Sequence, residues 1–319
     1  MHKLINVWTK PFDKRRIHQK GDTMKDSKNL YTRCFSEYKL SDEDLKKLQN
    51  ELLEILVDIK TVCDKYQIDY MLCGGTMLGA IRHKGFIPWD DDVDIMMLRN
   101  EYNKFKAVFD EELSEKYVLA EPLSSPRYFS KMVKVFKKDT TYVEIPTAGA
   151  DGPNMIFVDL FLLENVPNPG INRKIIAIAY NTAFRAASVC LDYKYPSLPI
   201  LEKSKTDREL RNYYNFRRSM GFFFSLFGSI QSYIKICESL ANQKEATNWL
   251  GIPSDSGYLD RIYPRDLLTA FTETEFCGYK MKIPKDYDKY LKAEYGDYMQ
   301  IPPPEKREIH SAYKIEFSK

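Results

Sequence analysis

The stretch YMLCGGTMLGAIRHKGFIPWDDDVDIMMLRNEY, residues 70–102, contains the features that decide the fold. Residues 68–73 (IDYMLC) predict a short buried strand, and Gly74-Gly75-Thr76 predict a tight turn that leads into a short helix. After a loop, residues 92–98 (DVDIMML) have the β-branched and apolar content of a second strand. The stretch therefore predicts a strand, a glycine turn, a helix and then a strand that begins with acidic residues.

Four aspartates crowd the start of this second strand: Asp90, Asp91, Asp92 and Asp94. In an extended chain alternate side chains share a face, so Asp92 and Asp94 point the same way. Two carboxylates this close repel each other unless a divalent cation neutralises them, and hard oxygen ligands suit Mg²⁺ or Mn²⁺. We therefore predict that Asp92 and Asp94 bind a metal ion. Asp90 and Asp91 are either accessory to that site or part of a solvated acidic loop.

A further carboxylate, Asp159, lies within the apolar sequence NMIFVDLFLL of residues 154–163, which predicts a buried strand. A lone carboxylate among apolar residues needs a partner, because burying an unpaired charge is costly. Asp159 is thus a candidate third metal ligand, and the alternative is a structural aspartate that is capped or paired with an arginine. A D-x-D pair alone does not decide the reaction, since metal-dependent glycosyltransferases also use one to hold a nucleotide-sugar diphosphate.

The glycine turn gives these acidic residues their context. The backbone at Gly74, Gly75 and Thr76 can approach a phosphate closely, and a helix N-terminus offers free N–H groups and the positive end of its dipole. A phosphate-binding turn beside a carboxylate metal site is typical of active sites that transfer phosphoryl groups. The alternative interpretation of the glycines is a plain tight turn.

The composition of the 319-residue chain sets wider limits. Lys and Arg number 48 against 45 Asp and Glu, a net charge of +3, so we expect no nucleic-acid partner held mainly by charge. No apolar run reaches the ~18 residues of a spanning helix, and the N-terminus lacks the apolar segment of a secretory signal. We expect a cytoplasmic protein whose six scattered cysteines are reduced. Either Met1 or Met24 can be the true start, since the residues between them show no periodicity.

Four segments are expected along the chain. Residues 1–40 form a flexible leader, and residues 41–170 form the core, which begins with an amphipathic helix capped by Ser41 and Asp44. Residues 171–250 predict a helical insert or subdomain that contains the sequence GFFFSLFG. Ordinary helical core is the favoured interpretation of these phenylalanines, and peripheral contact with a membrane surface is the alternative. Residues 251–319 are expected to pack on the core.

Residues 70–102 resemble the LicD family, which includes bacterial phosphocholine transferases and, more remotely, the animal fukutin-related proteins. The resemblance rests on the glycine pair, on L-G-A-x-R-H-K-G-F-I-P-W-D-D-D-x-D-I, on FVDLF at 157–161 and on KIPKDYDKYLKAEYGDYMQIPPPEKR at 282–307. It implies an α+β, nucleotidyltransferase-like fold of the polymerase-beta type, in which helices flank a small mixed sheet. In such enzymes the D-x-D and a third carboxylate bind Mg²⁺, which assigns this role to Asp92, Asp94 and Asp159.

The resemblance also implies a reaction. Family members transfer phosphocholine from CDP-choline to a hydroxyl group of a surface glycan such as teichoic acid or lipopolysaccharide and release CMP, and the fukutin-related branch transfers a phospho-polyol. We expect a CDP-linked donor and a glycan or lipid-linked glycan acceptor, with the enzyme in the cytoplasm or at the inner face of the membrane. The alternatives are nucleotidyl transfer from an NTP with pyrophosphate release, a non-catalytic glycan- or nucleotide-binding relative and, more weakly, glycosyl transfer. The donor alcohol, the acceptor and the oligomeric state stay open.

Several side chains near these motifs are candidates for contacts with the donor. They either pair with its phosphates or remain on the solvated surface: Arg82, His83 and Lys84 after the short helix, and Lys131 in the predicted strand SKMVKVF of residues 130–136. The general base is either His83 or a carboxylate. Trp89 either contacts the nucleotide base or the choline methyl groups, or simply packs. Residues 295–298 (YGDY) are expected to close over the site.

Overall fold

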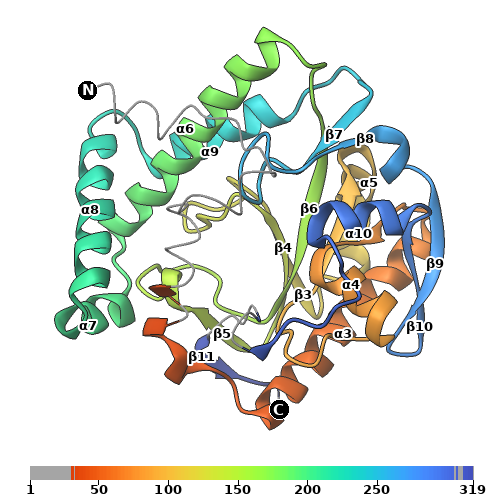
Figure 1. Ribbon diagram of the computed structural model, residues 1–319, viewed down its shortest axis with the longest axis horizontal. Coiled ribbons are helices and arrows are strands. Elements are labelled where there is room, and N and C mark those ends of the chain that lie inside the picture. The colour runs from red at the N-terminus through yellow and green to blue at the C-terminus, as the bar shows by residue number, and fades with distance from the viewer. Residues whose placement is uncertain (1–29, 32, 305–306, 308–311, 319) are drawn as a thin grey trace.

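The structure is a computed structural model that describes residues 30–31, 33–304, 307 and 312–318 (Figure 1). Most of the predicted leader, together with Met1 and Met24, lies outside the described residues. Helices and strands occur in both halves of the chain, and the strands near the middle of the fold form a curled mixed sheet (Figure 1). The fold is therefore α+β, as the sequence predicts.

The main sheet places two of the predicted acidic residues side by side. Its strands follow the spatial order β1 (Met71–Leu72), β2 (Asp94–Leu98), β6 (Phe157–Asn165), β4 (Val133–Lys137) and β3 (Tyr117–Ala120). Two further strands, β7 (Trp249–Gly251) and β8 (Ile262–Pro264), continue from the C-terminal end of β6. β2 and β6 run parallel, with Asp94 opposite Asp159, while β1, β4 and β7 join them antiparallel. Partners in adjacent strands face the same side of a sheet, so these two carboxyl groups are neighbours.

The helices on the sheet share one hydrophobic core with it. α3 (Asp42–Lys65) begins as predicted, because the Ser41 hydroxyl accepts a hydrogen bond from the Asp44 N–H at 3.1 Å. α5 (Arg99–Glu112), the hairpin of β9 (Phe271–Phe276) and β10 (Tyr279–Pro284), and α10 (Tyr287–Tyr295) bury apolar side chains in the same core. The C-terminal elements therefore pack on the sheet. A separate two-stranded sheet joins β5 (Thr141–Glu144) to β11 (Ala312–Glu316).

The helix begins earlier than the sequence predicts. The two glycines are the first residues of α4 (Gly74–His83), whereas the sequence predicts a turn before the helix. Gly74 has a φ of +54°, and a Cβ atom at this position would lie 2.9 Å from Oδ2 of Asp94. Both the backbone conformation and the available space therefore require glycine. The Asp94 N–H also donates to the Thr76 hydroxyl at 2.8 Å, which fixes the start of α4 against the start of β2.

Residues 171–250 contain four helices on one side of the sheet, at the left and top of Figure 1. They are α6 (Ile171–Lys194), α7 (Leu198–Thr206), α8 (Arg208–Ser225) and α9 (Ile230–Ala241). The predicted helical pattern is confirmed, while the division of the chain into four segments stays a prediction. In the described part of the chain, no helix has both the length and the apolar character needed to cross a membrane. All six cysteines are free thiols.

One interpretation of this helical region is wrong. Ordinary core was the favoured explanation for the phenylalanines of residues 221–228, but Phe222, Phe223 and Phe227 are exposed on the surface. Phe224 alone of the four packs inward, against Tyr233 of α9. Successive side chains of a helix are about 100° apart, so Phe224 faces the protein while Phe222 and Phe223 face outward.

Candidate active site

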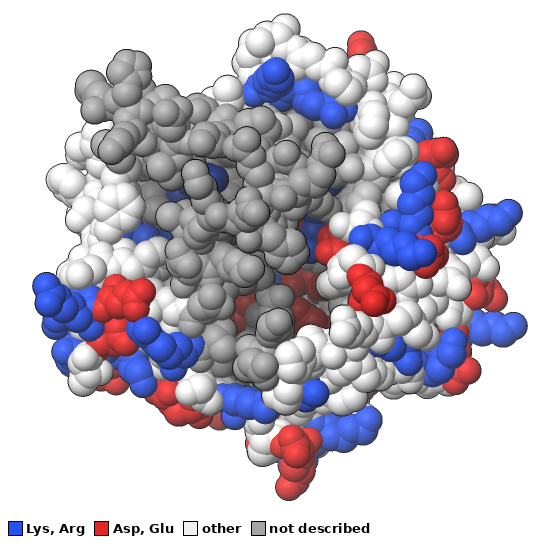
Figure 2. Space-filling model, viewed as in Figure 1, with Lys and Arg blue, Asp and Glu red and all other residues white. Residues whose placement is uncertain are grey.

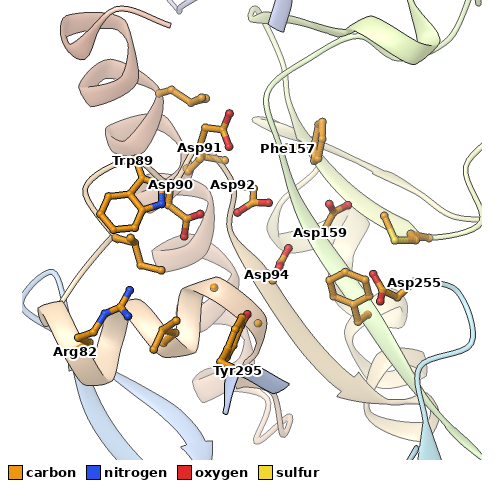
Figure 3. A pocket seen from close by; sticks show the side chains of 18 of the residues that line it. Arg82, Trp89, Asp90, Asp91, Asp92, Asp94, Phe157, Asp159, Asp255 and Tyr295 are labelled. Atoms are coloured by element: carbon orange, nitrogen blue, oxygen red, sulfur yellow. The ribbon is translucent and has the colours of Figure 1, made fainter. Parts of the chain in front are cut away.

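A cavity of about 610 Å³ lies where β2 and β6 begin. Asp94 of β2 and Asp159 of β6 line it together with Asp92 of the loop before β2, and their carboxyl groups face the same space (Figure 3). Acidic side chains are also visible in the recess near the middle of the face shown in Figure 2. The three aspartates that the sequence singles out are therefore brought together in one cavity.

Crowding and burial change the proton affinity of these carboxyl groups. Burial raises the pKa of Asp94 well above its usual range, and the charges of Asp92 and Asp159 raise it further. Burial raises the pKa of Asp159 to about 6, while the ammonium group of Lys134 acts in the opposite direction. Burial thus favours the neutral form of these carboxyl groups, and a bound cation would favour the ionised form.

The cation that the structure supplies is Lys134 of β4. Its register partner is Asp159, and its Nζ atom lies 3.3 Å from Oδ1 of Asp159 and 3.5 Å from Glu144. The ammonium group also lies 3.3 Å from the centre of the Phe157 ring, a cation–π contact. Asp159 and Glu144 raise the pKa of Lys134 despite its burial, so it stays protonated. Lys134 is therefore an internal counter-ion of the carboxylate group.

The donor set suits a hard divalent cation by its chemistry. Three carboxylates supply the oxygen ligands that Mg²⁺ and Mn²⁺ prefer. Oδ1 of Asp159 is buried and accepts no hydrogen bond from a described residue, although the Lys134 ammonium is near it. Within the described residues, no three or more Asp, Glu, His or Cys side chains are already grouped as a metal-binding cluster. The oxygen ligands of Asp92, Asp94 and Asp159 therefore fit a divalent cation by their chemistry.

The start of α4 forms the wall of the cavity beside the carboxylates. Gly74 and Gly75 line the cavity, and a Cβ atom at Gly75 would lie 3.1 Å from Oδ2 of Asp90. Thr76 does not line it, because its buried hydroxyl group accepts the hydrogen bond from Asp94. The absence of side chains at the two glycines leaves room for a ligand to approach the helix N-terminus.

The basic residues predicted after the short helix are not grouped around the cavity. Arg82 lines it, but its guanidinium group donates to the carbonyl oxygen of Tyr298 at 2.7 Å and to His83 at 2.9 Å. Burial and the Arg82 charge lower the pKa of His83, so the imidazole is neutral at pH 7. His83 and Lys84 are not cavity residues, and Lys84 is exposed at the end of α4. Arg82 thus holds the C-terminal segment against α4, and the other two lie outside the cavity.

The prediction for Lys131 is wrong, because the structure brings Lys134 to the cavity in its place. β4 begins only at Val133, so Lys131 precedes the strand, and its ammonium group lies 3.9 Å from the centre of the Phe184 ring of α6. Burial there lowers the pKa of Lys131 to about 8. The pairing of β4 with β6 decides which lysine faces Asp159, and this register is not visible in the sequence of one strand.

The remaining loop residues have mixed roles. Trp89, Asp90 and Asp91 line the cavity with the predicted ligands (Figure 3). The guanidinium group of Arg307 lies 4.0 Å from the centre of the Trp89 ring, so this ring already accepts a cation. Tyr295, Asp297 and Tyr298 line the cavity as well, and the closure of residues 295–298 over the site stays a prediction.

Two further cavity residues, Asp255 and Arg261, were not found from the sequence. Nε of Arg261 lies 3.0 Å from Asp255 and 3.4 Å from Glu294, and the Tyr263 hydroxyl group donates to Glu294 at 2.7 Å. Asp255 and Glu294 raise the pKa of Arg261 despite its burial. In the sequence SDSGYLDRIYP an arginine among polar and acidic residues is typical of a surface loop, so no local signal reveals it.

Comparison with known proteins agrees with this arrangement. A family model described as "LicD/FKTN/FKRP, nucleotidyltransferase domain" matches residues 67–186. The lipopolysaccharide cholinephosphotransferase LicD of Haemophilus influenzae is 31% identical over 271 residues, which are 83% of this chain and 95% of that protein. An uncharacterized protein of Rickettsia prowazekii is 38% identical over 68 residues, 19% of this chain and 26% of its own. Because the similarity to the Haemophilus protein extends over most of both chains, this protein belongs to the LicD family of phosphotransferase enzymes.

Proposed function

We propose that this protein transfers phosphocholine, or a similar phospho-alcohol, from a CDP-linked donor such as CDP-choline to a hydroxyl group of a surface glycan of the lipopolysaccharide type. The observation that carries the proposal is the meeting of Asp92, Asp94 and Asp159 with the glycine start of α4 in one cavity. The name of the Haemophilus relative, a lipopolysaccharide cholinephosphotransferase, supports the choice of phosphocholine and of lipopolysaccharide over teichoic acid.

The proposed cofactor is Mg²⁺ or Mn²⁺, held by Asp92, Asp94 and Asp159. Such an ion would bind phosphate oxygens of the donor and neutralise the charge that develops on them during transfer. The raised pKa values of Asp94 and Asp159 support this assignment, because they report negative charge that lacks solvation. Asp90 and Asp91 are proposed as accessory acidic residues at the edge of the same cavity.

The chain's own groups would bind and orient the donor. The N–H groups at Gly74 and Gly75 and the guanidinium group of Arg261, which all line the cavity, are proposed to contact the donor phosphates. Trp89 is proposed to receive the choline trimethylammonium group on the ring that now contacts Arg307. Lys134 would keep Asp159 ionised and in place.

The reaction forms one bond and breaks one. The acceptor hydroxyl oxygen attacks the phosphorus atom that carries choline, the bond from that phosphorus to the CMP oxygen breaks, and CMP leaves. The proton of the hydroxyl group passes to a general base. A carboxylate of the cavity is a better candidate for this base than His83, because His83 is not a cavity residue.

The decisive experiment incubates the purified protein with CDP-choline, Mg²⁺ and a lipopolysaccharide extract, and follows CMP by chromatography. We expect CMP release that increases with acceptor and stops when EDTA is added. CMP release that is unaffected by EDTA would contradict the metal assignment. Parallel reactions with teichoic acid as acceptor test the acceptor class.

Alternative donors separate the competing reactions. CDP-ribitol or CDP-glycerol consumed in place of CDP-choline would show a different donor alcohol with the same chemistry. Pyrophosphate release from CTP would show nucleotidyl transfer, and an inert protein that still binds CDP-choline would be a non-catalytic relative. Each outcome has its own product, so none can be confused with phosphocholine transfer.

A further inference from the structure

The C-terminal end of α8 exposes large apolar side chains that no described element covers. Phe222, Phe223, Leu226 and Phe227, here called the α8 tip, are 51%, 50%, 65% and 71% exposed. Their rings are ordered against one another: the Phe223 and Phe227 centroids are 5.1 Å apart, and Phe222 lies 5.6 Å from Tyr193 of α6. Single exposed apolar residues need no explanation, but a contiguous group of four marks an interaction surface.

The charge around the α8 tip is of one sign. Residues 210–237 contain four basic residues and no Asp or Glu, although the whole chain has 45 acidic residues in 319, about four per 28 residues. Arg217 is neutralised by the buried Asp192 at 2.6 Å, and Arg211 lies in the first turn of α8, about 18 Å along the helix from Phe223, whereas Lys235 of α9 is exposed. Lys194, the residue after Tyr193, is exposed as well. The surface is therefore aromatic and basic, a composition typical of helices that lie in the interface of anionic lipid bilayers.

We propose that the α8 tip binds an anionic lipid surface, with the phenylalanine rings inserted among the headgroups and the nearby Lys194 and Lys235 facing the lipid charge. The lack of acidic residues favours a negatively charged partner over a second copy of this chain, whose net charge is +3. No residue of the tip lines the cavity, so binding leaves the cavity free. The proposal goes beyond the proposed function, and its test needs neither donor nor acceptor.

The test is sedimentation of the full-length chain with vesicles of phosphatidylcholine alone or with about 30% phosphatidylglycerol. We expect binding to the anionic vesicles only, and a decrease of at least about tenfold when NaCl is raised from about 0.05 to about 0.5 M. The double substitution Phe223→Ser/Phe227→Ser should weaken binding at least about tenfold. Thermal unfolding checks that this variant is folded.

A matched control removes exposed apolar side chains elsewhere on the helical region. Ile171→Ser/Ile175→Ser changes two exposed residues at the far end of α6, about 33 Å and about 27 Å along the helix from Tyr193, respectively. This variant should bind anionic vesicles as the unchanged protein does. The proposal would be overturned if the unchanged protein bound neutral and anionic vesicles equally. It would also be overturned if the phenylalanine variant still bound anionic vesicles, or if the isoleucine control no longer bound them. A dimer in solution that dissociates on the phenylalanine substitution would also overturn it, in favour of self-association.

Discussion

Two regions of the molecule differ from the usual distribution of polar and apolar side chains. Carboxyl groups are buried where β2 and β6 begin, and phenylalanine rings are exposed at the end of α8. At the sheet, the carboxyl groups of Asp94 and Asp159 are withdrawn from water, whereas at the helix Phe223 and Phe227 are exposed to it. Each arrangement costs stability unless something binds there. The comparison teaches that ligands of opposite character are expected at the two places: a cation and phosphates at the sheet, and an apolar, anionic surface at the helix.

The largest effect is expected at the sheet. Asp94→Asn should lower the transfer rate by at least about three powers of ten, because it removes a proposed metal ligand. The same substitution should leave the fold intact and stabilise the metal-free protein, since it relieves repulsion with Asp92 and Asp159. CMP release and urea unfolding measure the two effects. Asp151→Asn, at an exposed aspartate paired with Arg127, is the control and should change neither.

A second prediction contrasts two lysines three positions apart. Lys134→Met should slow transfer about a hundredfold and destabilise the fold by about 3 kcal/mol, because it leaves Asp159 buried without its cation. Lys131→Met should leave transfer within about threefold and should not destabilise the fold at pH 7, because it removes a charge that burial disfavours. Steady-state kinetics and chemical denaturation compare the pair. Equal losses in the two variants would contradict the assignment of Lys134 to the site.

The third prediction concerns the pH dependence of stability in EDTA. The pKa of Asp159 is raised to about 6 in the folded protein, so the folded state binds more protons than the unfolded state between about pH 4 and pH 6. The contribution of Asp159 to the free energy of unfolding should therefore be greatest below that range and fall by about 2–3 kcal/mol as the pH rises through it. The raised pKa of Asp94 acts in the same direction. Asp159→Asn should flatten the profile, and an unchanged slope would contradict this account.

The smallest effects are expected near the α8 tip, where Phe224 packs inward and Phe227, three residues further along the chain, is exposed. Phe224→Ala should cost about 2 kcal/mol, because Phe224 packs against Tyr233 and beside Ile230. Phe227→Ala should change the free energy of unfolding by less than about 0.5 kcal/mol, because its ring is mostly exposed. Thermal or urea unfolding in the absence of lipid measures both. Similar costs at the two positions would show that Phe227 is covered in solution.

Local patterns were sufficient to predict much of the sheet region. The acidic strand, the glycine turn and the cap at Ser41 depend on residues close together in sequence, and each occurs where it was predicted or within a few residues. The roles of Lys134 and Arg261 could not be predicted in the same way. Lys134 is selected by the register between β4 and β6, and Arg261 reaches the cavity through pairs with Asp255 and Glu294. The exposure of the α8 tip likewise depends on how α8 packs on α6 and α9, which the composition of residues 221–228 does not reveal.

The contact between Lys134 and Asp159 has a consequence for how the enzyme is assembled in the cell. A protein whose acidic cluster depends on a metal ion cannot fold before it acquires that ion, as zinc fingers illustrate. Here a lysine from the same sheet neutralises part of the cluster. The newly made chain is therefore expected to fold first and to bind the proposed ion afterwards. On this proposal, chelators should inactivate the enzyme reversibly without unfolding it, and folded, metal-free enzyme should persist until the ion is supplied.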